Sequence, residues 1–257
     1  MNPTKIMFLG TSSALPDAGG DTVSFLINDR YLVDTGWAAV GNMRKLEVDP
    51  AQIEYLLFTH LHHDHYLSLP SLLFYFLSVR KPLKDLKIIG PADDVERVVK
   101  LAMNFLQTDN FYPDCSFPTV IPLTPGDSYE DENFNVATSS TKHPVQGLCY
   151  RFKDKQTGKF FSFTGDTAYH PPIIDLIKGS PLLIHEASMG PIAANPSDNA
   201  YLHSGAIDAA EIAKAADVGK LLLVHGSKSI SEASVEAARK IFLKPVEWPK
   251  DGQAYIL

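Results

Sequence analysis

The chain has 257 residues, of which 45% are hydrophobic and 21% are charged, as is usual for a globular protein with a substantial core. Its 23 basic and 30 acidic residues give a formal charge of −7, which does not favour a partner held mainly through its phosphates. Apolar runs are too short for a signal peptide or a membrane span, and Cys115 and Cys149 lack metal-ligand spacing, so we expect a cytoplasmic protein with free thiols.

Strand-like and helix-like segments alternate through the first half of the chain. Runs of apolar and β-branched residues predict strands at 5–10, 23–28, 31–34, 53–59 and 87–90. Apolar residues at helical spacing predict helices at 38–46, 67–79 and 93–107.

The middle of the chain, residues 119–164, is predicted as short strands and turns, including a hairpin of 147–153 and 159–164. Alternation then resumes, with predicted helices at 172–178, 204–216 and 231–242 and strands at 182–185, 221–225 and 254–257. A capping-box pattern at 229–232 precedes the last helix. Two α/β parts around a β-rich middle predict a four-layer α/β/β/α sandwich, and we expect residues 1–257 to form one domain.

One segment carries the strongest chemical signal. Residues 60–65 read His-Leu-His-His-Asp-His and directly follow the predicted strand at 53–59. Neutral imidazoles and carboxylates are ligands of zinc and similar divalent ions. The pattern therefore predicts a metal site, with two ions, rather than a solvated polar turn.

Three later residues share one setting, in which a polar side chain follows an apolar strand and has a small or rigid neighbour. They are His143, Asp166 and His225. Each one alone fits a structural histidine or a turn-capping aspartate equally well. Together with residues 60–65, they supply enough ligands for a pair of ions.

The order of these residues resembles the metallo-β-lactamase superfamily over nearly the whole chain, and most of all its ribonuclease Z and cyclic phosphodiesterase branch. The supporting segments are 8–16, 33–36, 163–167, 185–188 and 203–204. The resemblance implies the metallo-β-lactamase fold and one ion held by His60, His62 and His143. It implies a second ion held by Asp64, His65 and His225, with Asp166 between the two ions, while His63 faces away.

Two cations at such a centre lower the pKa of a shared water, which makes hydroxide available at neutral pH. Asp64 is then both a ligand and the group that orients this hydroxide. The second ligand position holds His62, whereas the diiron oxygen- and nitric-oxide-reducing members of the superfamily have glutamate there. We therefore expect a hydrolase that contains two divalent ions, with Zn²⁺ as the first choice and Mn²⁺ or Fe²⁺ as the others.

Two further residues are candidates for proton transfer. In the ribonuclease Z resemblance, His203 contacts the scissile phosphate and acts as a general acid; the alternative is an exposed neighbour of a helix-capping Ser204. Glu186 is predicted to assist proton transfer or to hold His203, although a purely structural carboxylate fits as well. Asp34 is expected to order the metal loop, residues 60–65, or one of its ligands. His185 is expected to lie in the core.

The sequence indicates the substrate less directly than it indicates the metal site. Ribonuclease Z proteins usually carry a long arm that grips transfer RNA between the positions of His143 and Asp166, whereas here the interval is only 23 residues. We therefore expect a phosphodiesterase that acts on a small molecule or short nucleotide. The alternatives are a transfer-RNA 3′-processing endonuclease, a lactonase, thioesterase, sulfatase or lactamase, and a non-enzymatic metal-containing carrier or binding module. Residues 108–118 are expected to form a lid or a dimer contact, and a homodimer is compatible with the sequence.

Overall fold

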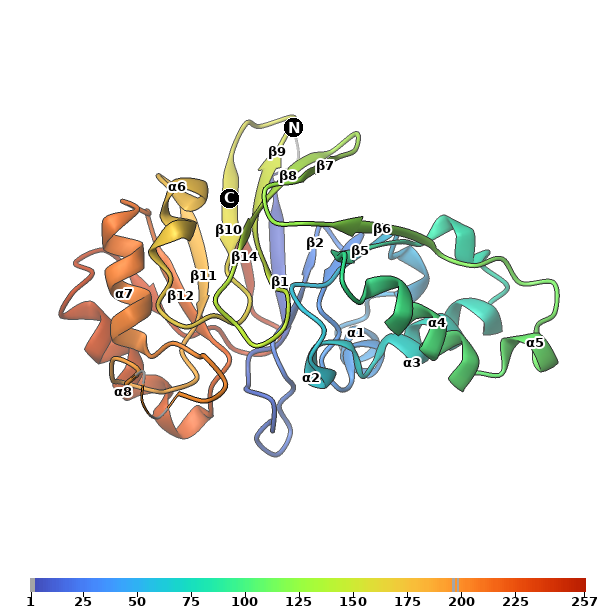
Figure 1. The fold of residues 1–257 in the computed structure, drawn as a ribbon, viewed down its shortest axis with the longest axis horizontal. Coiled ribbons are helices and arrows are strands. Elements are labelled where there is room, and N and C mark those ends of the chain that lie inside the picture. Colours follow the sequence, from blue (N-terminus) through green and yellow to red (C-terminus); the bar gives the residue numbers. More distant parts are fainter. Residues whose placement is uncertain (1–2, 196, 198) are drawn as a thin grey trace.

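The computed structural model describes residues 3–195, 197 and 199–257, which build two seven-stranded sheets (Figure 1). The first sheet has the order β14-β1-β2-β3-β4-β5-β6 and the second β13-β12-β11-β10-β9-β8-β7. The strands of the first are β1 (Lys5–Gly10), β2 (Ser24–Ile27), β3 (Tyr31–Val33), β4 (Tyr55–Leu57), β5 (Lys87–Pro91), β6 (Thr119–Leu123) and β14 (Ala254–Ile256). Those of the second are β7 (Ser128–Glu130), β8 (Phe134–Ser140), β9 (Leu148–Asp154), β10 (Phe160–Phe163), β11 (Leu182–Glu186), β12 (Leu221–Val224) and β13 (Val246–Glu247).

Burial on both faces explains why the strands are so uniformly apolar. In β1, Ile6 and Phe8 point into the core between the sheets, whereas Met7 and Leu9 point to the helices outside. Aromatic rings join the inner faces, and the rings of Phe25 and Phe163 meet edge to face with centroids 5.2 Å apart. A strand covered on both sides has no polar face to alternate with, so its sequence reads as a continuous hydrophobic run.

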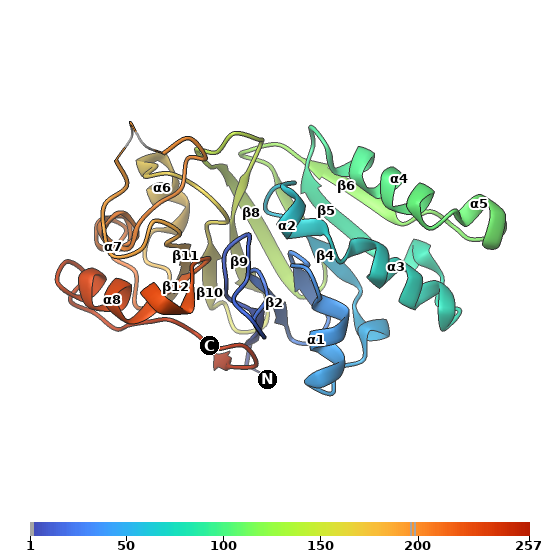
Figure 2. The same cartoon turned by 90° about the horizontal axis from the view of Figure 1, so that it is seen from below.

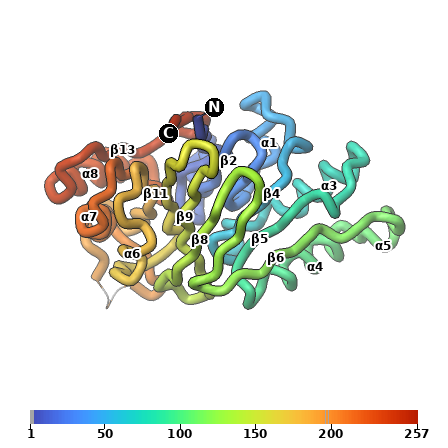
Figure 3. Tube along the Cα trace, turned by 90° about the horizontal axis from the view of Figure 1, so that it is seen from above, coloured from blue at the N-terminus to red at the C-terminus, as the bar shows by residue number. Residues whose placement is uncertain are grey.

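Helices cover the outer face of each sheet (Figure 2). The first sheet carries α1 (Ala39–Lys45), α3 (Leu69–Ser78) and α4 (Val95–Phe105), and the second carries α6 (Ile174–Ile177), α7 (Ala206–Ala215) and α8 (Lys228–Arg239). These layers confirm the predicted α/β/β/α sandwich. Strand β14 pairs antiparallel with β1, which brings the two ends of the chain together (Figures 2 and 3). Among the residues that the structure describes, every helix is too short or too polar to cross a bilayer.

Several predicted boundaries differ from the structure. The helix expected at 67–79 is α3 (Leu69–Ser78), and a separate short helix, α2 (His63–Tyr66), precedes it. Pro70 stands in the first turn of α3, where its missing N–H is harmless. The last helix begins at Lys228 because Ser227 is its N-cap and accepts a hydrogen bond from the Ser229 amide at 3.2 Å. The capping box predicted at 229–232 is therefore wrong.

Residues 108–118 do not form a lid over the metal loop. Their helix α5 (Thr108–Phe111) lies at the outer edge of the molecule next to α4, far from α2 in both views (Figures 1 and 2). The expected dimer contact of this segment stays a prediction.

The topology brings together the loops that follow several strands. Strands β3 and β4 run parallel in the first sheet, and β10, β11 and β12 run parallel in the second. In each group the carboxyl ends of the strands therefore open on one edge. The candidate site lies in the loops that leave these ends and in the loop after β8.

Candidate metal centre

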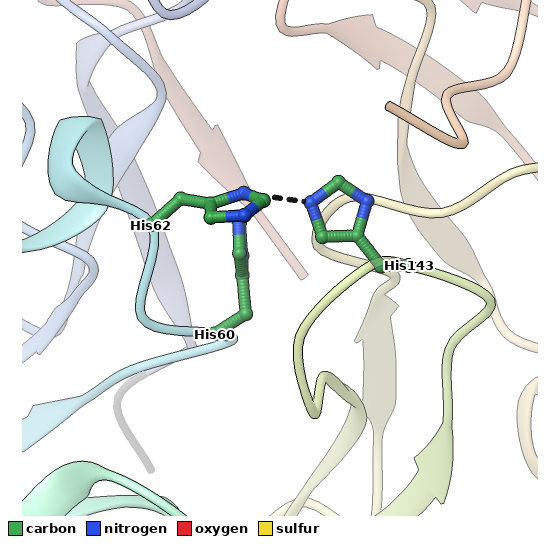
Figure 4. Close-up of side chains that lie close together, drawn as sticks. All are labelled: His60, His62 and His143. Atoms are coloured by element: carbon green, nitrogen blue, oxygen red, sulfur yellow. Dashed lines mark hydrogen bonds between the residues drawn. The ribbon is translucent and has the colours of Figure 1, made fainter. Parts of the chain in front are cut away.

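Three histidines form the first cluster. His60 and His62 lie in the loop between β4 and α2, and His143 lies in the loop between β8 and β9 (Figure 4). One ring nitrogen from each lies within 4.8 Å of the others, and His62 Nδ1 is 2.9 Å from His143 Nε2. Two segments that are 81 residues apart in the chain thus face each other across the first cluster.

A second cluster lies beside the first. Asp64 Oδ2 is 3.2 Å from His65 Nε2 and 3.4 Å from His225 Nε2. Asp166 Oδ2 lies 3.5 Å from His65 Nε2, 3.4 Å from His225 Nε2 and 3.8 Å from His60 Nε2. Asp166 therefore stands between the two clusters, in the place that the resemblance gives to the residue shared by both ions. The structure brings all seven predicted ligands together.

Buried atoms at the centre lack the partners that a folded protein normally provides. His60 Nε2, His65 Nε2 and Asp166 Oδ1 are buried and have no hydrogen-bond partner among the described residues. Leaving such atoms unpaired is costly, so they normally have a partner of some kind. A divalent cation satisfies nitrogen and carboxylate oxygen together, and this donor set fits zinc and its neighbours.

Burial keeps one set of imidazoles neutral, the form that binds metals. It lowers the pKa of His60 well below its usual value, lowers the pKa of His62, and lowers the pKa of His143 to about 4. Burial also acts on His65, but the carboxylates of Asp166 and Asp34 outweigh it and raise the pKa of His65. The carboxylates of Asp166 and Asp34 therefore favour a positive charge at the position of His65.

Asp34 organises the metal loop, as the sequence predicts. Its fully buried carboxylate accepts hydrogen bonds from the amide and the hydroxyl of Thr59, both at 2.8 Å, and lies 2.9 Å from His65 Nδ1. Thr59 Oγ1 in turn lies 3.1 Å from His60 Nδ1. A hydrogen on each Nδ1 leaves each Nε2 lone pair directed at the centre.

Glu186 plays a similar part in the second half of the molecule, the half built on the second sheet. Its fully buried carboxylate accepts hydrogen bonds from the Thr167 amide at 2.8 Å and the Ser188 hydroxyl at 2.7 Å, and lies 2.9 Å from His203 Nδ1. Burial works against a charged His203, but the carboxylate of Glu186 outweighs burial and raises the pKa of His203 to about 9. Asn199 holds the backbone of His203 through two further hydrogen bonds.

The neighbour of His203 does not cap the following helix. Gly205 is the N-cap residue of α7, and Asp208 accepts a hydrogen bond from its amide at 2.8 Å. Ser204 is fully buried and donates to the Thr167 carbonyl at 2.6 Å. The alternative reading of Ser204 as a helix cap is therefore wrong.

Two other histidines stand apart from the centre. His63 is exposed, its ring lies against Tyr66 at 5.6 Å between centroids, and it belongs to none of the clusters found among the described residues. His185 is fully buried, and its Nδ1 lies 2.8 Å from the Glu186 carbonyl oxygen. Both positions agree with what the sequence predicts.

Sequence reasoning missed three residues that support the site: Ser188, Asn199 and Asp21. Asp21 accepts hydrogen bonds from the amides of Trp37 and Ala38 at 2.8 and 3.0 Å, which ties the loop before β2 to the loop after β3. The sequence offers no signal for Asp21 or Asn199, because both act through contacts that no spacing rule describes. The segment 185–188 contains Ser188, but the sequence does not show which residues contact its hydroxyl, so it predicts no role for this serine.

The two halves touch beside Asp166. Gly165 adopts a left-handed conformation with φ of +61°, and a Cβ added there would lie 2.7 Å from Thr59 Cβ. Real side chains do not approach so closely, so only glycine fits at 165. This contact sets how near the loop after β10 comes to the loop after β4.

Comparisons with known proteins agree with this geometry. Residues 29–226 match the model of a family described as "Beta-lactamase superfamily domain". A Ribonuclease Z of Listeria innocua is 28% identical over 287 aligned positions, which cover 90% of this chain and 92% of the relative. Among solved structures, the metallo-beta-lactamase fold protein YhfI of Bacillus subtilis is similar over 100% of both chains with a TM-score of 0.85 and 23% identity. The short form of human tRNase Z is similar over 98% of both chains with a TM-score of 0.77 and 23% identity.

Proposed function

The chain belongs to the beta-lactamase superfamily and is a metal-dependent hydrolase, and from that premise we propose that it cleaves phosphodiester bonds in RNA. The observation that carries the proposal is the pairing of two ligand clusters with a histidine held by a buried carboxylate, Glu186. The names of the relatives support RNA as the substrate, since Ribonuclease Z proteins of several organisms align over most of this chain. The substrate of the proposal is therefore the 3′ end of a transfer-RNA precursor.

Seven residues bind the metals in this proposal. His60, His62 and His143 would hold one ion, Asp64, His65 and His225 would hold a second, and Asp166 lies close to ligands of both clusters. Zn²⁺ is the first choice because the ligands are imidazoles and carboxylates. Such a pair supplies a water whose pKa is low enough to provide hydroxide at neutral pH.

The chain's own residues orient the reaction. Asp64 accepts a hydrogen bond from the attacking water and aims it at phosphorus. As the new P–O bond forms, the P–O bond to the leaving group breaks, and His203 donates its proton to the leaving oxygen. Glu186 lies 2.9 Å from His203 Nδ1, so it holds the ring in place and stabilises its charged form.

A second candidate is a small phosphodiester substrate. The interval from His143 to Asp166 contains only the hairpin of β9 and β10, with no protruding arm to grip transfer RNA. The alignment with the Listeria relative spans 287 positions, more than the length of this chain, so that relative contains residues that this chain lacks. With a formal charge of −7, these facts favour a short nucleotide.

A substrate panel tests both candidates. Purified protein is incubated with precursor transfer RNA, cyclic nucleotides, bis-p-nitrophenyl phosphate, aryl sulfates and lactones, with and without a chelator. We expect cleavage at the 3′ side of the transfer RNA, which the chelator abolishes and added Zn²⁺ restores. Hydrolysis of cyclic nucleotides with the precursor left intact would select the second candidate. Activity on lactones or sulfates alone, or activity that survives metal removal, would contradict phosphodiester hydrolysis by a metal centre.

A further inference from the structure

Ser188 lies in the loop after β11, next to His225 in the loop after β12. Its hydroxyl oxygen is 2.7 Å from His225 Nδ1 and 2.7 Å from Glu186 Oε2. The same oxygen is 2.9 Å from the His225 carbonyl oxygen and 3.3 Å from His203 Nδ1. A hydroxyl has one hydrogen to donate and two lone pairs that accept. The two oxygen neighbours can only accept from this hydroxyl, whereas each histidine nitrogen accepts from it or donates to it according to which ring nitrogen carries the hydrogen.

The position of the hydrogen on His225 fixes the direction of the first bond. His225 Nε2 faces Asp64 and Asp166, at 3.4 Å from an oxygen of each, on the side where we place the metals. Its lone pair is available to a metal only when the hydrogen is on Nδ1. Nδ1 then donates to Ser188, so the serine oxygen accepts here.

The serine hydrogen is directed to Glu186, because an ionised carboxylate only accepts and is the stronger acceptor of the two oxygens. The other carboxylate oxygen, Oε1, lies 2.9 Å from His203 Nδ1. A continuous path of hydrogen bonds therefore runs from His225 through Ser188 and Glu186 to His203. Because His225 is only 2% exposed, an Nδ1–H that lost its acceptor would have little access to water.

We propose that Ser188 is a positioning residue that fixes the tautomer of His225 and joins this ligand to the Glu186–His203 pair. It thereby sets the affinity of the ion assigned to Asp64, His65 and His225, and leaves the other ion unaffected. The inference rests on the metal assignment of the proposed function, but it concerns ion affinity and needs no substrate.

The test is a titration of metal-free protein with Zn²⁺ against a competing chelator, followed by calorimetry. Support around a metal ligand is typically worth about 10- to 100-fold in affinity. For Ser188→Ala we expect a loss of that order for one equivalent of Zn²⁺ and no change for the other. Ser188→Thr keeps the hydroxyl, so it should restore the affinity. If Ser188→Ala does not fold, Ser188→Gly removes the same hydroxyl and gives the same comparison.

Two further variants serve as references. Thr59→Val removes a hydroxyl that lies 3.1 Å from His60 Nδ1, in the support of the first cluster. It should weaken chiefly the other equivalent, because Asp34 keeps its bonds to the Thr59 amide and to His65 Nδ1. The double variant with Ser188→Ala should therefore bind both ions weakly. Ser140→Ala is the control, because its hydroxyl lies 3.4 Å from Nε2 of His170, which belongs to none of the clusters that the described residues form. This variant should bind both ions normally.

Three results would overturn the inference. The first is two unchanged equivalents in Ser188→Ala. The second is equal weakening of both, because the hydroxyl would then act only on general stability. The third is a Ser188→Thr variant that binds as poorly as Ser188→Ala. A protein that binds Zn²⁺ in the expected pattern but cleaves no phosphodiester would contradict the proposed function and leave the role of Ser188 intact.

Discussion

The two halves of the molecule support the candidate metal centre with the same arrangement of hydrogen bonds. In the first half, the Thr59 hydroxyl donates to buried Asp34 and lies beside His60 Nδ1, and Asp34 also faces His65. In the second half, the Ser188 hydroxyl donates to buried Glu186 and lies beside His225 Nδ1, and Glu186 also faces a histidine, His203. Each half thus uses one hydroxyl and one carboxylate to fix two imidazoles.

The difference lies in what the two imidazoles do. In the first half both rings, His60 and His65, are predicted ligands. In the second half only His225 is a predicted ligand, whereas His203 is the predicted proton donor. The same arrangement therefore builds a binding site on one side and connects a ligand to the reaction on the other. Variants in the two halves should consequently change different quantities.

The largest effect is expected where metal binding and water orientation depend on one residue. Asp64→Ala removes a carboxylate that lies near His65 and His225, and it should lower turnover by about 1000-fold or more, as for residues that act as a unit. Turnover of bis-p-nitrophenyl phosphate measures the loss, and circular dichroism checks the fold. A variant that keeps a tenth of the activity would mean that Asp64 does not orient the water.

His203→Ala should act on chemistry and leave metal content unchanged. Loss of a general acid typically costs about 100- to 10,000-fold, and the cost is greatest for a leaving group that needs the proton. We expect a large loss on RNA and a small one on p-nitrophenyl esters, whose leaving group departs without protonation. Equal losses on both substrates would rule out the general-acid role.

A matched pair compares the two carboxylates. Asp34→Asn should lower metal affinity by about 10- to 100-fold, because Asp34 supports two predicted ligands. Glu186→Gln should lower turnover more than metal affinity, because its histidine partner at 2.9 Å is His203. Chelator competition and turnover are measured on both variants. Identical profiles would contradict the division of roles between the two halves.

The smallest effect is expected at His63. This side chain is exposed and lies outside the clusters, although it sits in the middle of the histidine-rich segment. His63→Ala should change metal content and turnover by less than about 2-fold, within the range of ordinary surface substitutions. Loss of an ion from this variant would show that the ligands had been assigned in the wrong register.

The sequence predicted the parts that follow from local pattern. Residues 60–65 form one continuous segment, the end of the loop after β4 and the start of α2, so their spacing alone indicated a metal site. Apolar strands buried on both faces indicated the layered fold. The supporting contacts are of another kind. Ser188 meets His225 across 37 residues and Asp21 meets Trp37 across 16, and no spacing rule describes such pairs. The start of α8 was misplaced because Ser227 and Ser229 are both good N-caps, and only the fold selects between them.

The prediction of the substrate rests on information other than the fold and the ligands. Charge and the short interval before Asp166 favoured a small molecule, whereas the relatives named Ribonuclease Z favour RNA. Neither the strands nor the ligands distinguish these proposed substrates, because either one would present a phosphodiester to the same centre.

The contact between Gly165 and Thr59 bears on which ion the centre accepts. It joins the backbone of one half to the Cβ of the other, so the gap between the halves does not depend on the rotamer of any ligand. A side chain at 165 would remove no ligand, but it would push the loops apart and lengthen every distance across the centre. Since selection among divalent ions depends on geometry more than on ligand type, such a change should favour larger ions over smaller ones. We therefore expect Gly165, a residue that has no side chain, to limit the size of the ion that the centre would accept.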